Sequence, residues 1–216
     1  MNVPKISDST VRRLSLYLNQ LRALSTRDVR LVSSRELAEG SGTTAAQVRK
    51  DLSNFGSFGK RGQGYRVDEL RGRIEGILGV ERRWRVAVVG AGRIGTALLG
   101  YRDLPARGFE IVAAFDADPA RTGREVSGVP VYPVDELETR LRADDIGIVI
   151  LATPPSVAGE LAERVAAAGV EGILSFAASK LETDASIAVR WMDVALELEG
   201  LSFLITSGDS QNGGTA

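Results

Sequence analysis

The feature that most constrains the fold is a glycine-rich turn set between an apolar strand and a helix. The segment 86–95 reads VAVVGAGRIG and contains the pattern G-x-G-x-x-G. In this context the first glycine permits the tight turn, the second lets the backbone approach a pyrophosphate, and the third lets the helix pack closely on the strand. The pattern therefore predicts a dinucleotide site at the start of the helix. Its candidate contacts are Gly90, Gly92, Arg93, Ile94 and Gly95.

From Arg85 onward, short apolar runs alternate with helical stretches, which is typical of a parallel sheet covered on both faces. The expected strands are 86–89, 111–115, 129–132, 146–152 and 172–176, with 187–191 as a further candidate, and the expected helices are 94–99, 134–142 and 156–168. This is an α/β Rossmann pattern, a doubly wound parallel sheet. Apolar residues at 194, 198, 201 and 205 fit a closing helix, and the polar, glycine-containing stretch 207–216 predicts a disordered tail.

Two further positions fall where predicted strands end, at the edge where open parallel sheets bind ligands. Asp116 lies 21 residues beyond Gly95, where an acid accepts hydrogen bonds from an adenosine ribose. Its charge would repel a 2′-phosphate, which favours NAD(H) over NADP(H). Thr153 and Pro154 follow the strand 146–152. The Pro154–Pro155 pair either forms an apolar wall near a nicotinamide or simply opens the next helix.

The first 80 residues predict a winged helix-turn-helix. The first expected helix covers residues 8–24 and is capped by Ser7 or Asp8, and a second, short helix covers 35–39. A third helix is expected from a cap at Thr43 or Thr44 to about residue 55, and a fourth from a cap at Asp68 to about residue 79. The residues 34–51 fit the helix-turn-helix itself, and the glycine-rich segment 55–65 fits a wing. The expected core is Leu37, Ala38, Val48 and Leu52, with Gly42 in the turn.

Such a module points to double-stranded DNA as a partner. The second helix of the motif enters the major groove, where Arg and Lys can read guanine and Gln can read adenine. Basic residues in the wing would contact phosphates or the minor groove. A helical protein-binding module with a solvated basic face is the alternative. The candidate DNA contacts are Ser34, Thr44, Gln47, Arg49, Lys50, Lys60 and Arg61.

The charge distribution agrees with this division. Residues 1–80 carry 14 Lys and Arg against 8 Asp and Glu, a net charge of +6. The rest of the chain carries 13 Lys and Arg against 20 Asp and Glu, a net charge of −7. A basic segment on an acidic body suits a nucleic-acid reader, although chance segregation of surface charge gives the same numbers. We expect a DNA-binding domain over 1–80, a nucleotide-binding domain with its closing helix over 81–206, and a tail over 207–216.

The composition excludes several other functions. The chain has no Cys and no His, which removes disulfides, thiolate chemistry, the commonest metal ligand and the commonest general base. No metal site and no enzyme activity are expected, and no apolar run is long enough to span a membrane. A cytoplasmic location is the natural expectation. Two rival hypotheses remain, an NAD-dependent dehydrogenase with a small helical cap and a regulatory subunit that binds CoA or another nucleotide.

The stretches QVRKDLSNFGSFGKRGQGY and WRVAVVGAGRIGTALLGY resemble the Rex family of redox-sensing transcriptional repressors, and the likeness covers about residues 3–205. The resemblance implies a homodimer with a winged-helix domain, a Rossmann domain and a C-terminal helix swapped between subunits. It implies binding to palindromic operators of respiratory and fermentative genes when NADH is low, and release by NADH. NAD+ would compete weakly or support DNA binding.

The resemblance also implies roles for individual positions. Arg49, Lys50, Lys60 and Arg61 match DNA-contacting positions, and the glycines of the turn match the NAD(H) fingerprint together with Asp116. Further matches are Tyr101, near the nicotinamide, Asp193, which begins the swapped helix, and Phe176, near the pocket. The sequence departs from the family at Asn54, at Val194, which is smaller than in some members, and at Ala178, where a proline is usual. The smaller Val194 would weaken discrimination between the two nicotinamide states.

Overall fold

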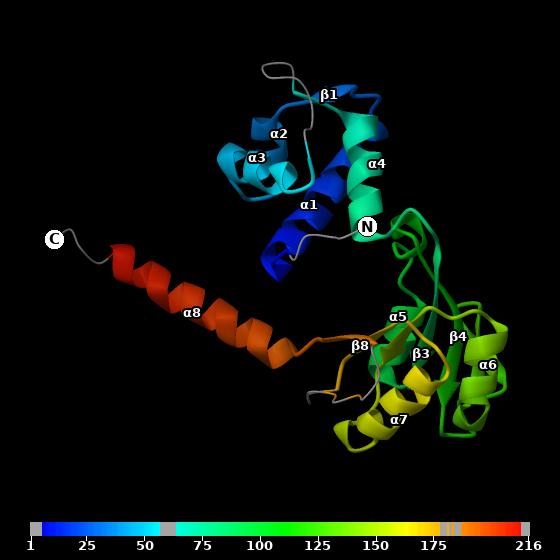
Figure 1. The fold of residues 1–216 in the computed structure, drawn as a ribbon. Helices are drawn as coiled ribbons and strands as arrows, with labels where there is room; N and C mark the ends of the chain where they lie inside the picture. The colour runs from blue at the N-terminus through cyan, green and yellow to red at the C-terminus, as the bar shows by residue number, and fades with distance from the viewer. Residues whose placement is uncertain (1–5, 57–63, 178–180, 182, 184–186, 213–216) are drawn as a thin grey trace. The chain divides into compact units, whose positions relative to one another are not determined.

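The computed structural model describes residues 6–56, 64–177, 181, 183 and 187–212, and the chain folds as two compact units (Figure 1). The first unit spans Met1–Arg82 and the second Arg83–Ala216. The division falls where purely helical sequence patterns give way to alternating strands and helices.

The described part of the first unit consists of four helices and a two-stranded antiparallel sheet. Its elements are α1 (Asp8–Ser25), β1 (Leu31–Val32), α2 (Ser34–Glu39), α3 (Ala45–Ser53), β2 (Tyr65–Arg66) and α4 (Val67–Leu78). A helix-turn-helix formed by α2 and α3, with one strand of the sheet before it and the other after it, is the winged-helix arrangement that the sequence predicts. The strands are too short to be recognised from alternation, because each contributes only two residues.

Side-chain caps fix the starts of three of these helices. Ser7, Ser33 and Thr44 each accept a hydrogen bond from the backbone N–H three residues later, at 3.2, 3.2 and 3.1 Å respectively. Such a bond satisfies one of the backbone donors that a helix leaves unpaired at its first turn. The structure thereby decides between the alternative caps of α1 and α3, in favour of Ser7 and Thr44, and shows that Ser33 caps α2.

The start of α4 differs from expectation. Asp68 is the expected cap, but the cap position is occupied by Arg66 and the helix begins two residues earlier than expected, at Val67, directly after β2. Asp68 therefore lies in the first turn, where it accepts a 3.1 Å hydrogen bond from the Ser25 hydroxyl. The pairing of β2 with β1 sets this boundary, since the strand must end before the helix can begin.

The predicted core of the helix-turn-helix is confirmed. Leu37, Ala38, Val48 and Leu52 are all buried, and they pack in one cluster with residues of α1 and α4. Gly42 has a φ of +62°, the left-handed conformation that allows a tight turn between α2 and α3. The small side chain of Ala38 belongs to the same buried cluster as those of α3.

The described part of the second unit is built on a seven-stranded sheet in the order β5-β6-β4-β3-β7-β8-β9. All neighbouring strands are parallel except β5 and β6. Taken without β5, the sequence of strands across the sheet is the 3-2-1-4-5-6 order of a Rossmann fold. The strands are β3 (Trp84–Val89), β4 (Phe109–Asp116), β5 (Arg124–Val126), β6 (Val129–Pro133), β7 (Ile148–Leu151), β8 (Gly172–Ser175) and β9 (Ala188–Trp191).

One edge strand is absent from the sequence prediction. β5 pairs antiparallel with β6 through a turn at Ser127 and Gly128, which have φ values of +54° and +81°. Two consecutive positive φ values are characteristic of the tight hairpin turns that match strand twist. A serine in the first of these positions is a weak signal, so the hairpin is not evident from the sequence.

Helices cover both faces of the sheet, as predicted. Ala87 and Val89 of β3 face one buried cluster, with α6 and α7, while Val86 and Val88 face another, with α5. The expected helix 134–142 is divided into a 3₁₀ turn and a short α-helix. The helical elements of this layer are α5 (Arg93–Leu99), η1 (Pro105–Arg107), η2 (Val134–Glu136), α6 (Leu137–Ala143) and α7 (Pro155–Ala167).

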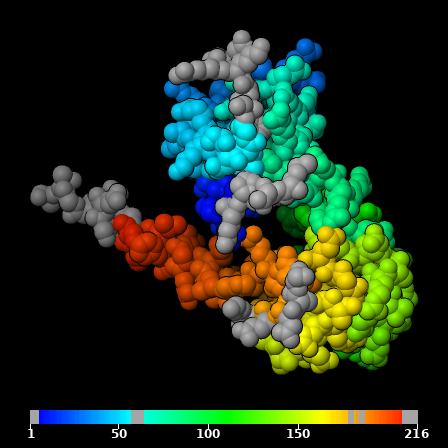
Figure 2. Space-filling model, viewed as in Figure 1, coloured from blue at the N-terminus to red at the C-terminus, as the bar shows by residue number. Residues whose placement is uncertain are grey.

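The last element, α8, spans Val194–Asn212. The expectation of a disordered tail from residue 207 is therefore wrong for 207–212, because an established helix adds further residues at little cost even when they are polar; residues 213–216 lie outside the described range. The apolar side chains of α8 are between 48 % and 68 % exposed, and the helix (orange to red) projects from the body of its own unit (Figures 1 and 2). No helix in the described ranges combines the length and apolarity needed to cross a bilayer.

Candidate functional site

The glycine turn between β3 and α5 has the geometry that its sequence predicts. Gly90 has a φ of +99°, and a Cβ there would lie 2.5 Å from the Ala152 carbonyl oxygen. A Cβ on Gly95 would lie 1.9 Å from the Gly90 carbonyl oxygen, so the third glycine is needed for close packing of helix on strand. At Gly92, by contrast, a Cβ would meet only Arg121 Nη1, at 3.7 Å, among the residues that the structure describes. Gly92 therefore leaves open space at the position where the pattern expects a pyrophosphate.

A cavity of about 610 Å³ lies beside this turn, at the carboxyl ends of β3, β4 and β7. This is the edge of an open parallel sheet where ligands bind, beside the reversal of strand order at β3 and β7. Its walls are largely apolar. Of the predicted nucleotide contacts, the structure brings together Gly90, Gly92, Arg93, Ile94, Asp116, Thr153, Pro154 and Phe176 around this cavity.

Asp116 is more constrained than its assignment to a ribose suggests. Its carboxylate is 8 % exposed and accepts hydrogen bonds from the backbone N–H groups of Ala91, at 2.7 Å, and Asp118, at 2.8 Å. Arg121 Nη1 lies 3.3 Å from the same carboxylate and also lines the cavity. Asp116 thus holds the glycine turn in place, and Arg121 brings a positive charge beside Asp116 that the sequence patterns do not indicate.

Thr153 presents a polar atom with no partner inside the protein. Its Oγ1 is buried, lines the cavity and has no hydrogen bond among the described residues. A buried hydroxyl without a partner is unfavourable unless a ligand or water satisfies it. Together with the open space at Gly92, this hydroxyl shows that the residues fit a dinucleotide bound across the turn.

Tyr101 and Asp193 do not line this cavity. Tyr101 follows the far end of α5, which is seven residues long, so it lies about 10 Å from the glycine turn along the helix axis. It lines a different hollow, of about 590 Å³, together with Glu110 and Ser127. Asp193 caps α8 by accepting a 2.8 Å hydrogen bond from the backbone N–H of Ala195. Within one chain, these two residues are not part of the nucleotide cavity.

The second candidate surface is the exposed face of α3. Arg49 and Lys50 are both exposed on it, and Thr44 stands at its first turn. Arg49 Nη1 donates a 2.9 Å hydrogen bond to the Ser34 hydroxyl of α2, which joins two of the predicted DNA contacts. The expected wing contacts, Lys60 and Arg61, lie outside the described residues.

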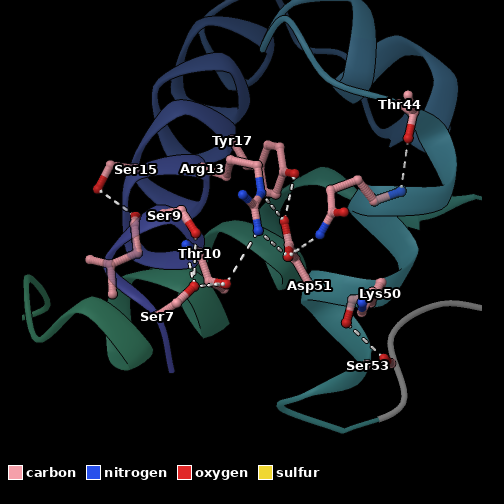
Figure 3. A network of polar contacts seen from close by, with 12 residues as sticks. Ser7, Ser9, Thr10, Arg13, Ser15, Tyr17, Thr44, Lys50, Asp51 and Ser53 are labelled. Carbon is pink, nitrogen blue, oxygen red and sulfur yellow. Dashed lines mark hydrogen bonds and ion pairs between the residues drawn. The ribbon is translucent and has the colours of Figure 1, made fainter. Parts of the chain in front are cut away.

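Sequence reasoning missed a buried acid on this helix. Asp51 is 1 % exposed, and its carboxylate accepts hydrogen bonds from Arg13, Tyr17 and Gln47 (Figure 3). Burial raises the pKa of Tyr17 to about 12, helped by its hydrogen bond to Asp51. Burial alone would raise the pKa of Asp51, but the hydrogen bonds from its three partners outweigh it and lower that pKa. One sequence signal could have revealed this buried acid. Asp51 follows Gln47 by four residues and lies on the side of α3 that carries the buried Val48.

Comparison with known families matches each unit separately. The family described as "Putative DNA-binding protein N-terminus" matches residues 5–53, and the family described as "CoA binding domain" matches residues 81–179. The first match includes α3, whose exposed face is one candidate surface, and the second includes the glycine turn and the cavity beside it.

Similar proteins cover almost the whole chain. The redox-sensing transcriptional repressor Rex of Carboxydothermus hydrogenoformans is 43 % identical over 93 % of this chain and 97 % of its own length. The Streptomyces coelicolor protein of the same name is 44 % identical over 92 % of this chain and 77 % of its own.

Solved structures of a Rex-family repressor, RSP, resemble this fold. RSP in complex with β-NAD+ and operator DNA matches with a TM-score of 0.86 and 33 % identity over 98 % of this chain and 99 % of that one. RSP with β-NADH matches with a TM-score of 0.83 and 31 % identity over 96 % and 98 %.

Proposed function

This chain belongs to the Rex family of redox-sensing transcriptional repressors, and we propose that it binds palindromic operators while NADH is scarce and leaves them when NADH binds. It is a repressor and not an enzyme. The observation that carries the proposal is the presence, in one chain, of a helix-turn-helix with an exposed basic face and a Rossmann cavity beside a glycine turn. Operator DNA and free NADH are both present in the cytoplasm, and we propose that the protein is located there.

On the DNA side, α3 is the recognition helix. Arg49 and Lys50 extend from its exposed face and are suited to guanine edges or phosphates. The hydrogen bond from Arg49 to Ser34 holds the guanidinium in one place before DNA binds. A side chain fixed in this way loses less conformational entropy on binding. Lys60 and Arg61 are proposed to contact the backbone from the wing.

On the nucleotide side, the cavity residues fit NADH and NAD+. Gly92 lets the backbone approach the pyrophosphate, and the buried Thr153 hydroxyl offers a hydrogen bond to the ligand. Pro154 and Phe176 add apolar walls. An uncharged reduced nicotinamide enters apolar surroundings more readily than the positively charged oxidised ring does. This difference in affinity is what can shift the protein between two states, by a coupling of about 1–3 kcal/mol.

We further propose that the working form is a homodimer whose subunits exchange α8. The apolar side chains of this helix, such as Leu201 and Phe203, are exposed in the single chain. A second copy would cover them and would match the twofold symmetry of a palindromic operator. Tyr101 and Asp193 lie outside the nucleotide cavity of their own chain, and they would contribute to nucleotide sensing only once the dimer has formed.

The test is an anisotropy titration of the full chain on a labelled palindromic Rex-type operator, with NADH and NAD+ added in separate experiments. We expect tight binding without NADH, release by NADH and retention with NAD+. Binding that is indifferent to both nucleotides would remove the sensing role and leave a DNA-binding protein. A failure to bind at modest salt would overturn the repressor function itself.

The match of residues 81–179 to a CoA-binding family justifies one additional ligand in this titration. Coenzyme A contains an adenosine and a pyrophosphate, so it could occupy the same turn. Release by coenzyme A with no effect of NADH would assign the cavity to that ligand. Release by NADH alone is the expected result.

A further inference from the structure

We propose that Arg13, Tyr17 and Asp51 form a positioning cluster that sets the orientation of the recognition helix, and that Gln47 belongs to this cluster and does not read a base. The proposal rests on the proposed function, because α3 is taken as the helix that enters the groove. Arg13 and Tyr17 lie on α1 and Asp51 lies on α3 (Figure 3), and Gln47 belongs to α3 as well.

The cluster is centred on a single carboxylate. Arg13 donates to Asp51 through Nε, at 2.6 Å, and through Nη2, at 2.7 Å, which is a two-point ion pair. The Tyr17 hydroxyl donates at 2.9 Å and the Gln47 amide at 2.8 Å. Arg13 Nη2 also donates to Thr10 Oγ1 at 3.2 Å. Two parallel bonds from a planar guanidinium define an angle as well as a distance.

The ion pair between Arg13 and Asp51 constrains the orientation of α3, which the apolar contacts of this helix constrain only weakly. α3 is nine residues long, and its buried apolar side chains are Val48 and Leu52. Apolar packing holds the helix against the core but tolerates small rotations, whereas a two-point ion pair does not. The pair therefore decides how the exposed side chains of α3 are aimed, including those of Arg49 and Lys50.

The cluster also keeps a negative charge away from DNA. A free carboxylate on a recognition helix would repel the phosphate backbone. Asp51 is 1 % exposed and is neutralised by Arg13, so α3 presents only positive charge on its exposed face. The acid thus orients the helix without weakening its attraction to DNA.

Gln47 has a different role in the structure from the one its sequence position suggests. Reading adenine requires an amide that presents both its donor and its acceptor to the base edge. The Gln47 Nε2 group instead donates to Asp51, one turn further along the same helix. The amide is held along α3 by this bond, and base reading is left to Arg49, Lys50 and Thr44.

The first test replaces the cluster by apolar side chains of similar size, Arg13→Met, Tyr17→Phe and Asp51→Leu together. Removing the carboxylate together with the guanidinium and the tyrosine hydroxyl avoids leaving a buried charge unpaired, so the domain is expected to fold. The matched control is Arg22→Met with Glu75→Leu, which removes the 3.1 Å ion pair between α1 and α4. The Arg13 and Arg22 side chains are equally exposed, at 23 %.

The decisive measurement is the ratio of affinities for operator and for non-specific DNA of equal length. We expect the cluster variant to lose about tenfold in this ratio, and the control to keep the wild-type value. The slope of log affinity against log salt should not change. An unchanged ratio in the cluster variant would overturn the proposal. A decrease of about 0.9 in the slope would also do so, because Arg13 would then be a phosphate contact.

A second measurement does not depend on DNA. In the single variant Arg13→Lys, which cannot form two parallel bonds, backbone amides of α3 should exchange with solvent faster than in wild type, while those of α4 keep their rates. Equal exchange of α3 in both proteins would contradict the positioning role. If the wild-type chain failed to bind the operator, the proposed function would fail, and this exchange experiment would still test the cluster.

Gln47 is tested on operators with single base substitutions. Gln47→Ala should lower affinity for all operators by a similar factor, and Gln47→Glu should lower it more, because a second carboxylate would face Asp51. Loss of discrimination at one A·T position only, with the other positions unaffected, would show that Gln47 reads that base.

Discussion

The carboxylate of Asp116 accepts a 2.7 Å hydrogen bond from the backbone N–H of Ala91, so the end of β4 holds the glycine turn that follows β3. An ionised carboxylate has about four acceptor positions. Ala91, Asp118 and Arg121 occupy three of them. Asp116 therefore has room for one hydrogen bond from a ribose, and its first role is to shape the turn.

Gly92→Ala should separate folding from nucleotide binding. The added methyl group meets only Arg121 Nη1, at 3.7 Å, and Gly92 has an ordinary φ of −74°, so the free energy of unfolding should change by less than about 0.5 kcal/mol. NADH affinity, measured by calorimetry, should fall about tenfold or more, because the methyl group occupies the path of the pyrophosphate. Gly72→Ala, which adds a methyl group in open space on α4, is the control and should leave NADH affinity unchanged.

Arg121 should moderate the choice between NADH and NADPH. Its guanidinium lies 3.3 Å from Asp116 and lines the cavity, where an arginine can accommodate a 2′-phosphate. We expect wild type to favour NADH, and Arg121→Ala to weaken NADPH binding several-fold more than NADH binding. Fluorescence titration with each nucleotide measures both affinities. Arg107→Ala, outside the cavity, serves as the comparison, and an equal effect on both nucleotides would refute the role of Arg121.

Arg49→Ala should reduce operator specificity at one base pair. A two-point contact between arginine and guanine is worth about 1–3 kcal/mol, so the loss should be confined to operators that carry the guanine. Ser34→Ala should have a smaller effect of the same kind, because it releases the 2.9 Å bond that holds Arg49 in place. Competition binding with substituted operators measures both effects. A uniform loss across all sequences would instead make Arg49 a phosphate contact.

Leu201→Glu on α8 should weaken the proposed dimer. Leu201 is exposed in the single chain, and a charge placed in an apolar subunit interface is unfavourable unless it is paired. Sedimentation velocity should show a shift toward monomer, and affinity for the palindromic operator should fall more than affinity for a half-site. Glu199→Gln, a polar change on the same helix, should keep the dimer. A Leu201→Glu variant with unchanged mass and operator affinity would remove α8 from the interface.

The ion pair between Glu138 and Arg164 should make the second unit sensitive to acid. The Arg164 guanidinium donates to Glu138 at 2.5 and 2.9 Å and lowers the pKa of that carboxyl to about 2. Because the folded pKa lies below the usual value of 4.5, the stabilisation is complete above that pH and is lost as the pH falls toward 2. Glu138→Gln should cost about 1–2 kcal/mol in urea unfolding at pH 7 and much less near pH 2.

The control for this prediction is Glu163→Gln, an exposed position on α7. It should leave the pH dependence of unfolding as in wild type. An identical difference between wild type and Glu138→Gln at pH 7 and near pH 2 would show that the pair contributes by packing and not by charge.

Much of the fold was predictable because its signals are local. The inner strands β3, β4, β7 and β8 are largely apolar runs, and the glycine turn specifies its own backbone path. Very short strands were not predictable, because a strand of two or three residues has no recognisable period. They are the hairpin strand β5 before Ser127 and the two-residue strands β1 and β2. The start of α4 at Val67 likewise depends on strand pairing.

The sequence by itself determined the two kinds of domain, the glycine turn and the basic face of α3, because each depends on residue type and spacing along a short segment. Only the tertiary structure decided what Asp51, Gln47 and Asp116 do. Arg13 and Asp51 are 38 residues apart, and Ala91 and Asp116 are 25 apart. A buried carboxylate takes its role from the donors that folding brings to it, and spacing along the chain does not reveal which donors those are.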